Sequence, residues 1–297
     1  MEFKKSFLER YSKLTDINEF KKYCSREFRK SIRINTLKIS VKDFLKRINL
    51  ELEKIKWCDE GFFVNDRITL GNMNEHFLGY FYVQEATSML PSLALDIKKK
   101  ILDMCAAPGS KTGQIAAMMK NKGLIIANDK DYIRLKALTL NLQRLGVINT
   151  VVTNMKGYFI KEKFDSILLD APCSGTGTIR KSPGTLQIYN TNMIRKLSAE
   201  QKGLINNAFN ILNDNGSLVY STCSLEPEEN EEVVNFLLNR YDNAKVERIK
   251  FKGLKTSDSV LEFEGKRYND EIKECIRIWP QDNDTDGFFV AKIRKIG

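Results

Sequence analysis

The chain has 297 residues, of which 42% are hydrophobic, and its 48 Lys and Arg against 38 Asp and Glu give a net charge of +10. No apolar run approaches the roughly 20 residues of a membrane-spanning helix, and the N-terminus lacks the apolar core of a signal peptide, so we expect a cytoplasmic protein without a membrane partner. A single histidine, His76, and the lack of a C-x-x-C pair argue against histidine-assisted nucleophiles and against a metal site, whereas the positive charge favours a polyanionic partner such as nucleic acid.

Residues 1–78 predict a small α+β unit that is rich in basic residues. Its first helix would bury apolar side chains at helical spacing, and a strand would follow where apolar and polar residues alternate. The predicted elements are this helix with Phe3, Phe7, Leu8, Tyr11 and Leu14, a strand at 31–37, a helix at 41–50 and strand-like alternation at 57–70. No Gly-, Ser- or Pro-rich linker follows, so we expect the unit to pack rigidly against the rest of the chain.

Residues 79–297 alternate predicted strands with predicted helices. The strands are expected at 101–104, 124–128, 150–153, 166–170 and 217–221, and the helices at 112–120, 132–145, 198–213 and 228–240. A helix between successive strands implies a parallel sheet with right-handed crossovers. Two further strands, at 275–279 and 287–294, suit an antiparallel hairpin at the edge of that sheet.

The first of these strands leads into a loop of small residues, DMCAAPGSKT at 103–112. Cys105 and Ser110 stand where a phosphate-binding P-loop needs glycine, and the G-x-G-x-x-G dinucleotide pattern is absent. The remaining interpretation is a loop for S-adenosylmethionine. It is supported by Asp129, which ends the next strand, where a carboxylate can accept hydrogen bonds from ribose hydroxyls. Asp129 could also cap the helix that follows.

Two cysteines follow two buried strands, in DAPCSG at 170–175 and STCS at 221–224. Ligands of open α/β sheets bind outside the carboxyl ends of the strands, so Cys173, Cys223 and Asp170 should face one cleft. A thiolate and a neighbouring acid can activate C5 of a pyrimidine: the thiolate adds to C6, the ring becomes an enamine, and C5 can attack a methyl donor. These residues alone do not decide which cysteine attacks.

The chain resembles the Sun-domain (Nol/Nop/Sun) RNA cytosine-5 methyltransferases, and within them the compact archaeal-type enzymes that act on tRNA. The segments that carry the resemblance are FDSILLDAPCSG (164–175), LVYSTCSLEPEEN (218–230), DMCAAPG (103–109), YVQEA (82–86), RINTL (33–37) and DGFFVA (286–291). The resemblance implies a Rossmann-like class I methyltransferase domain at 79–297 with helices on both sheet faces, an RNA-binding subdomain at 1–78, S-adenosylmethionine as cofactor and a monomeric enzyme.

The resemblance also implies roles for single residues. Cys223 would be the nucleophile, Cys173 would assist product release, Asp170 would act near N3 of the base, and Lys111 would pair with Asp170. The residues expected to bind the cofactor are Cys105, Ala106, Ala107, Pro108, Gly109, Ser110, Lys111, Asp129, Arg134 and Asp170. The residues expected to bind RNA are Arg33, Asn35, Arg180 and Lys181, the last two because a basic pair after a glycine-rich loop suits backbone phosphates.

Two positions depart from the family pattern, and a second substrate and two other functional classes stay open. Ser110 replaces a glycine of the cofactor loop, and Lys156 stands where the family places an aspartate toward adenine, a role that Asn154 could take. A ribosomal RNA substrate is the alternative to tRNA. A catalytically idle RNA-binding scaffold would have no reason to keep both thiols and Asp170, and an amino-directed methyltransferase would need Pro-Pro and an aromatic residue after the acid.

Overall fold

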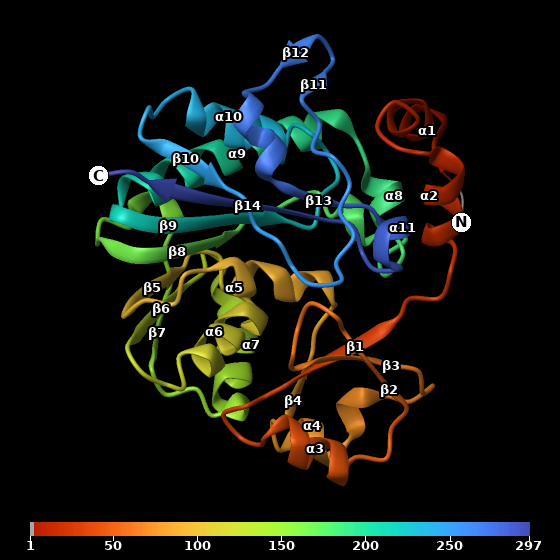
Figure 1. Ribbon diagram of the computed structural model, residues 1–297, viewed down its shortest axis with the longest axis vertical. Coiled ribbons are helices and arrows are strands. Elements are labelled where there is room, and N and C mark those ends of the chain that lie inside the picture. Colours follow the sequence, from red (N-terminus) through yellow and green to blue (C-terminus); the bar gives the residue numbers. More distant parts are fainter. Residues whose placement is uncertain (1–2) are drawn as a thin grey trace.

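A computed structural model describes residues 3–297, so the first two residues of the predicted N-terminal unit lie outside it. Within this range the chain forms a small antiparallel sheet and a large mixed sheet (Figure 1). The small sheet has the order β2-β3-β1-β4 and is formed by β1 (Lys30–Ile34), β2 (Leu52–Lys54), β3 (Gly61–Val64) and β4 (Phe81–Val83). With it lie α3 (Val41–Arg47), η1 (Leu70–Asn72) and α4 (Asn74–Phe77). Ile32, Phe44 and Phe81 form its buried centre.

The boundary between the two units does not fall simply at residue 78, where the sequence placed it. β4 follows that residue, yet it pairs with β1, so the small sheet continues past it. The first two helices, α1 (Lys5–Tyr11) and α2 (Ile17–Cys24), pack instead on the larger unit. Phe7 contacts Tyr189 edge to face, and Phe20 contacts Trp279 in the same way. The chain therefore begins on the larger unit, crosses to the small sheet and returns.

The large sheet has the order β10-β14-β9-β8-β5-β6-β7, with β13 paired to β14. Its parallel strands are β5 (Lys100–Asp103), β6 (Leu124–Asn128), β7 (Thr150–Thr153), β8 (Phe164–Asp170) and β9 (Leu212–Thr222). Its antiparallel strands are β10 (Ala244–Glu247), β13 (Ile276–Ile278) and β14 (Phe288–Lys295). The predicted C-terminal hairpin of β13 and β14 is confirmed at the end of the sheet beyond β9, and β10 pairs with the later residues of β14 on the same side as β13.

Helices cover both faces of this sheet, as the alternation of its buried residues requires (Figure 1). On one face Ile101 and Leu168 pack against α5 (Leu90–Ala94) and α6 (Ser110–Met118). On the other face Ile167 and Leu169 pack against α9 (Thr191–Asn210) and α10 (Glu231–Leu238). The remaining elements are α7 (Tyr132–Leu145), α8 (Thr185–Ile188), α11 (Pro280–Asn283), β11 (Glu262–Phe263), β12 (Lys266–Arg267) and the 3₁₀ turns η2 (Thr87–Met89), η3 (Gly157–Phe159), η4 (Thr176–Thr178) and η5 (Asp270–Glu274).

The Rossmann-like fold class expected from the sequence is confirmed. Across residues 3–297, no helix has the length and apolar character needed to span a bilayer.

Candidate active site

The two strand-end cysteines meet at the carboxyl edge of the large sheet. β8 and β9 run in parallel with Asp170 beside Ser221, so the segments that follow them leave the sheet side by side. The Sγ atoms of Cys173 and Cys223 lie 3.1 Å apart and are partly buried. The hydrogen bond to Cys223, together with burial, raises the pKa of Cys173 well above its usual value. Either thiol can donate the hydrogen bond that joins them.

Asp170 lines the same cavity as the two cysteines and is held by two short hydrogen bonds. Its Oδ2 accepts a hydrogen bond from Lys111 Nζ at 2.6 Å, and its Oδ1 accepts one from the Ser221 hydroxyl at 2.7 Å. Burial alone would lower the pKa of Lys111, but the Asp170 carboxylate raises it above the usual value, with help from Asp103 and Cys223. A protonated lysine thus pairs with the acid beside the thiols.

One cavity of about 320 Å³ connects these groups to the loop after β5. It is lined by Met104, Cys105, Ala107, Asn128, Asp129, Lys130, Arg134, Lys156, Gly157, Tyr158, Asp170, Ala171, Pro172, Cys173, Glu200, Leu204 and Cys223. The structure therefore brings both cysteines and five of the ten predicted cofactor residues to a single cavity, namely Cys105, Ala107, Asp129, Arg134 and Asp170.

The Asp129 carboxylate binds the backbone of the loop that follows β5. Its Oδ2 accepts a hydrogen bond from the Ala107 amide at 3.2 Å, and Arg134 lies 3.7 Å from the same oxygen. Arg134 also donates to the Ala107 carbonyl at 2.6 Å. The helix cap is a different residue, because Asp131 accepts the first amides of α7. Asp129 is thus left for the cavity, and the capping role considered for it is wrong.

The other members of the cofactor loop have backbone or packing positions. Ala106 is buried, and Pro108 accepts a hydrogen bond from Asn141 through its carbonyl. Gly109 has φ of +99°, and a Cβ there would lie 2.9 Å from Leu138, so this position requires glycine. Ser110 begins α6 without positive φ. Serine therefore fits this position, and the loop shift considered for it is not needed.

Sequence reasoning missed part of the cavity wall. Lys130, Tyr158 and Glu200 line it, and Lys130 pairs with Glu200 from α9. Asn154 is not among the lining residues; its amide donates to the Asp129 carbonyl at 2.8 Å. Among the lining residues at this end of the cavity, only Lys156 stands out in the sequence, as a departure from the family pattern. Glu200 lines the cavity because α9 packs beside it, which the sequence does not reveal.

The backbone around the thiols is packed without room for side chains. Gly177 donates its amide to the Cys223 carbonyl at 2.9 Å and accepts from the Gly287 amide at 2.8 Å. A Cβ at Gly177 would lie 2.2 Å from the Gly287 carbonyl oxygen and 2.7 Å from that of Cys223. The Cys173 segment, the Cys223 segment and the start of β14 are therefore joined at the level of main chain.

Three of the four residues predicted to contact RNA are buried, which corrects that expectation. Arg33 donates to Gln84 at 2.8 Å and to the Ser110 carbonyl at 3.2 Å. Asn35 donates to the carbonyls of Gly79 and Leu145. These side chains tie the small sheet to the large unit, so they are not free to bind phosphates.

The basic pair after the glycine-rich loop divides between two environments. The Arg180 side chain is 2% exposed and forms an ion pair with Asp284 at 2.7 Å. It also donates to the carbonyls of Arg26 and Glu27. Lys181 is exposed and remains the accessible cation of the four.

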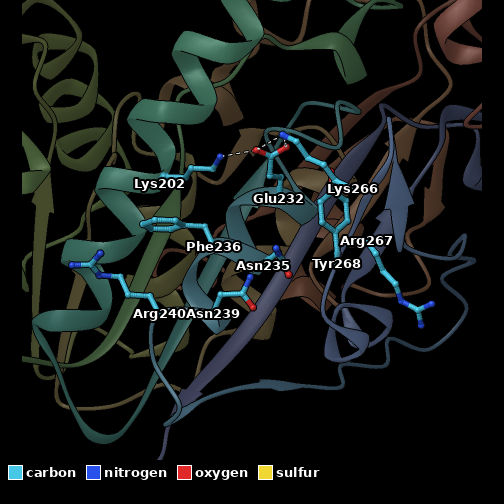
Figure 2. A pocket seen from close by; sticks show the side chains of 9 residues that line it. All are labelled: Lys202, Glu232, Asn235, Phe236, Asn239, Arg240, Lys266, Arg267 and Tyr268. Carbon is cyan, nitrogen blue, oxygen red and sulfur yellow. Dashed lines mark hydrogen bonds and ion pairs between the residues drawn. The ribbon is translucent and has the colours of Figure 1, made fainter.

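A larger cavity of about 620 Å³ lies beside α10 and the β11–β12 hairpin (Figure 2). Figure 2 shows Lys202 and Lys266 both turned toward Glu232, whose carboxylate they bind. Its lining comprises Lys202, Glu232, Asn235, Phe236, Asn239, Arg240, Lys266, Arg267 and Tyr268. This set contains no thiol and no residue of the cofactor loop, so the smaller cavity is the candidate active site. Among residues 3–297 there is no group of His, Cys, Asp and Glu able to hold a metal ion.

Comparison with protein families finds two matches that together span most of the chain. The family described as 16S rRNA methyltransferase RsmB/F matches residues 91–294, and the N-terminal domain of 16S rRNA methyltransferase RsmF matches residues 3–86. A tRNA (cytosine(49)-C(5))-methyltransferase of Pyrococcus abyssi is 48% identical, with 99% of this chain and 98% of that protein covered. A ribosomal RNA small subunit methyltransferase F of Shewanella piezotolerans is 43% identical over 94% of this chain and 60% of that protein. The chain thus spans about three fifths of the latter protein's length.

Solved structures share the whole architecture. A methyltransferase homologue from Pyrococcus horikoshii superposes with a TM-score of 0.85 at 34% identity, covering 99% of this chain and all of that one. NSun6 from Pyrococcus horikoshii with SFG also gives a TM-score of 0.85, at 26% identity and 99% coverage of both chains.

Proposed function

This chain belongs to the RsmB/F (Sun-domain) family of RNA cytosine-5 methyltransferases, and we propose that it methylates C5 of a cytosine in tRNA with S-adenosylmethionine as the methyl donor. The observation that carries the proposal is the pair of thiols 3.1 Å apart, beside Asp170 and in the cavity of the cofactor loop. An attacking thiol, a second thiol and an acid are the groups that this reaction needs.

We assign the attack to Cys223. The family resemblance gives the attack to the cysteine of the STCS segment, and burial with the Cys223 contact raises the pKa of Cys173, which suits Cys173 less to attack. Cys223 and Asp170 line the same cavity, so the attacking thiol and the acid can face one base. The Cys223 thiolate adds to C6 of cytosine, and its electron pair becomes the C6–S bond.

Addition at C6 moves negative charge toward N3 and O2 of the ring. We propose that Asp170 and Lys111 neutralise it, with the proton of the lysine reaching N3 through the carboxylate. The 2.6 Å contact between them supports such a relay. When bound, S-adenosylmethionine supplies an electrophilic methyl group that the activated C5 carbon accepts.

Release requires that the C5 proton leave and that the C6–S bond break. We assign this step to Cys173, which lies against the sulfur of the adduct. As the C6–S bond breaks, Cys173 passes its proton to the departing Cys223 sulfur, 3.1 Å away, and takes the proton from C5. The C5=C6 double bond reforms, and the proton on N3 returns to Asp170 and Lys111.

The cavity residues suit S-adenosylmethionine. Asp129 at the end of β6 offers a carboxylate to ribose hydroxyls, and the Cys105 and Ala107 backbone gives the close approach that a small-residue loop allows. SFG, the ligand of the NSun6 structure, is an analogue of this cofactor. We place Asp129, Arg134 and the 105–111 loop at the cofactor, and the two cysteines at the base.

The choice of tRNA rests on the relative from Pyrococcus abyssi, which is 48% identical over nearly all of both chains. A ribosomal RNA substrate is the second candidate, because both matching family descriptions refer to 16S rRNA enzymes. We further propose that the protein acts as a cytoplasmic monomer.

The two candidates are separated by methylating each RNA in vitro. Unmodified tRNA transcripts and 16S rRNA fragments are incubated with the enzyme and S-adenosylmethionine, and 5-methylcytosine is mapped by bisulfite sequencing. We expect one protected cytosine in tRNA and none in the rRNA fragments. Methylation of rRNA alone would move the substrate to the second candidate, and no 5-methylcytosine in either RNA would refute the proposed reaction.

A further inference from the structure

The segment that follows Cys223, EPEENEE at 226–232, reads as a solvated acidic run, yet three of its glutamates are fully buried. Glu226, Glu229 and Glu231 each have 0% exposure. Burying a carboxylate is costly unless charge or hydrogen bonds compensate it. Each of the three must therefore have a specific partner.

Two of these glutamates bind arginines from distant parts of the chain. Glu226 accepts from Arg10 Nε at 2.9 Å and from the Tyr11 hydroxyl at 2.6 Å, which fixes α1. Glu231 binds Arg277 of β13 through both oxygens, at 2.8 and 2.6 Å. Both are ion pairs that hold secondary structure in place.

Glu229 differs from them because none of its partners within residues 3–297 is a cation. Its Oε2 accepts from the Ser174 amide at 2.9 Å and from Gln201 Nε2 at 3.0 Å. Its Oε1 accepts from the Ser224 hydroxyl at 3.2 Å. One carboxylate thus contacts the residue after Cys173 and the residue after Cys223.

The same network reaches the other side of Cys173. Gln201 donates to the Pro172 carbonyl at 2.8 Å with the nitrogen that also binds Glu229. The hydroxyls of Ser174 and Ser224 lie 3.1 Å apart. The Cys173 residue is therefore held on both flanks by bonds that converge on Glu229.

The Cys223 segment has supports of its own. Asn230 donates to the Ser224 carbonyl at 2.9 Å and accepts from Thr222, whose hydroxyl oxygen in turn accepts from the Ser224 amide. Loss of the Glu229 carboxylate would leave these bonds intact. The Cys173 segment depends on Glu229 more than the Cys223 segment does.

We propose that Glu229 is a positioning residue that fixes the Cys173 thiol against the Cys223 thiol, and that it controls release of the covalent enzyme–RNA adduct rather than its formation. This inference rests on the proposed function. Glu229 does not touch the base in this arrangement; it acts through Ser174 and Gln201.

The test is Glu229→Gln, which keeps the size of the side chain but turns one acceptor oxygen into a donor nitrogen. The variant is incubated with tRNA transcript and S-adenosylmethionine, and the covalent complex is measured on denaturing gels. We expect the steady-state adduct to rise and the turnover to fall by about tenfold, the effect of one lost charge-assisted hydrogen bond. The affinity for S-adenosylmethionine, measured by calorimetry, should stay within about twofold because no cofactor residue changes.

Glu226→Gln is the matched control, since Glu226 is equally buried in the same segment but binds α1. It should lower the thermal unfolding temperature without raising the adduct. Gln201→Met serves as a second variant if Glu229→Gln does not fold, because it removes the link to Pro172 and leaves the carboxylate in place. It should raise the adduct in the same direction.

A second readout needs no RNA. Iodoacetamide labelling of the folded protein, followed by mass spectrometry of the cysteine peptides, should show a higher rate at Cys173 relative to Cys223 in Glu229→Gln than in wild type. Wild-type adduct, turnover and labelling in both variants would overturn the inference while leaving the methylation reaction intact. Lower turnover of Glu229→Gln without more adduct would mean that Glu229 has only a structural role, and this result would also overturn the inference. If wild-type protein makes no 5-methylcytosine, the proposed function fails, and the labelling ratio still decides the positioning of Cys173.

Discussion

Asp103 ends β5 with a carboxyl group that has few partners. Its Oδ2 accepts a hydrogen bond from the Thr112 hydroxyl at 2.7 Å, and its Oδ1 is buried without one within residues 3–297. Burial, reinforced by the carboxylates of Asp170 and Asp129, raises the pKa of Asp103 from 3.8 to about 7. The folded protein therefore binds this proton more tightly than the unfolded chain does.

The consequence is a pH-dependent stability that one substitution should remove. The contribution of protonated Asp103 to the free energy of unfolding is complete below about pH 4 and is lost as the pH rises through about 7. Between pH 5 and pH 8, urea denaturation should show the wild-type free energy of unfolding falling relative to Asp103→Asn by about 3 kcal/mol. Parallel pH profiles for the two proteins would place the titration elsewhere.

The two cysteines should give opposite defects when each is replaced. Cys223→Ala should abolish both methyl transfer and covalent adduct, because no thiolate remains to add to C6. Cys173→Ala should form the adduct and fail to release it, so a slow-migrating enzyme–RNA band should accumulate on a denaturing gel. Turnover by Cys223→Ala would assign the attack to Cys173 instead. The buried Cys275→Ala, at a position outside the cavity, provides the control and should show neither defect.

At the scale of elements, α1 illustrates how a short helix is stabilised by docking. Seven residues are too few for an isolated helix to be stable in water. Phe7 and Tyr11 are fully buried, and the Arg10 side chain, 9% exposed, binds Glu226, Glu228 and Glu264. The helix is therefore held by its contacts with the large unit.

Arg10→Ala should be strongly destabilising because it leaves Glu226 buried without its cation. We expect a loss of about 3–5 kcal/mol in the free energy of unfolding, measured by urea denaturation. Lys5→Ala in the same helix is the control, since its pair with Glu9 is exposed and should contribute less than about 1 kcal/mol. Equal stability of the two variants would contradict this view of α1.

The elements that could be predicted from sequence are those whose pattern is local. The strands at 124–128 and 150–153 and the helix at 132–145 have their predicted bounds, since hydrophobic periodicity and flanking polar residues mark them. The strand-end motifs likewise placed Asp170 and both cysteines at one sheet edge.

What could not be predicted depends on tertiary partners. The β10 sequence, AKVE, has little strand character, and its pairing with β14 makes it a strand. The RNA contacts expected for Arg33, Asn35 and Arg180 were wrong, because the sequence does not show whether a hydrogen-bond donor meets a phosphate or a buried carbonyl. The buried Glu226, Glu229 and Glu231 were missed for the same reason.

At the scale of the whole molecule, the buried side chains of Arg33 and Asn35 join the two units. Arg33 of β1 binds the carbonyl of Ser110 at the start of α6, and Asn35 binds that of Leu145 at the end of α7. The RNA-facing charge must come from exposed residues instead. Lys181 is an exposed lysine on the segment after Cys173, and we predict that it contacts RNA.

Lys181→Ala should weaken tRNA binding and flatten its salt dependence, because phosphate contacts release counterions when they form. The slope of log Kd against log salt should fall by about one unit, measured by filter binding at several salt concentrations. Lys122→Ala is the control: this exposed lysine precedes β6, at the opposite edge of the sheet. An unchanged slope for Lys181→Ala would remove this segment from the RNA path.

Gly177 restricts how this protein can vary. Even one added methyl group would collide with the carbonyl oxygens of Gly287 and Cys223, so a substitution there disturbs two neighbouring segments at once. No single compensating change in a side chain can relieve a collision between backbones. A change of RNA target, in evolution or by design, must therefore come from side chains around Gly177, because the backbone of these three segments has to stay as it is.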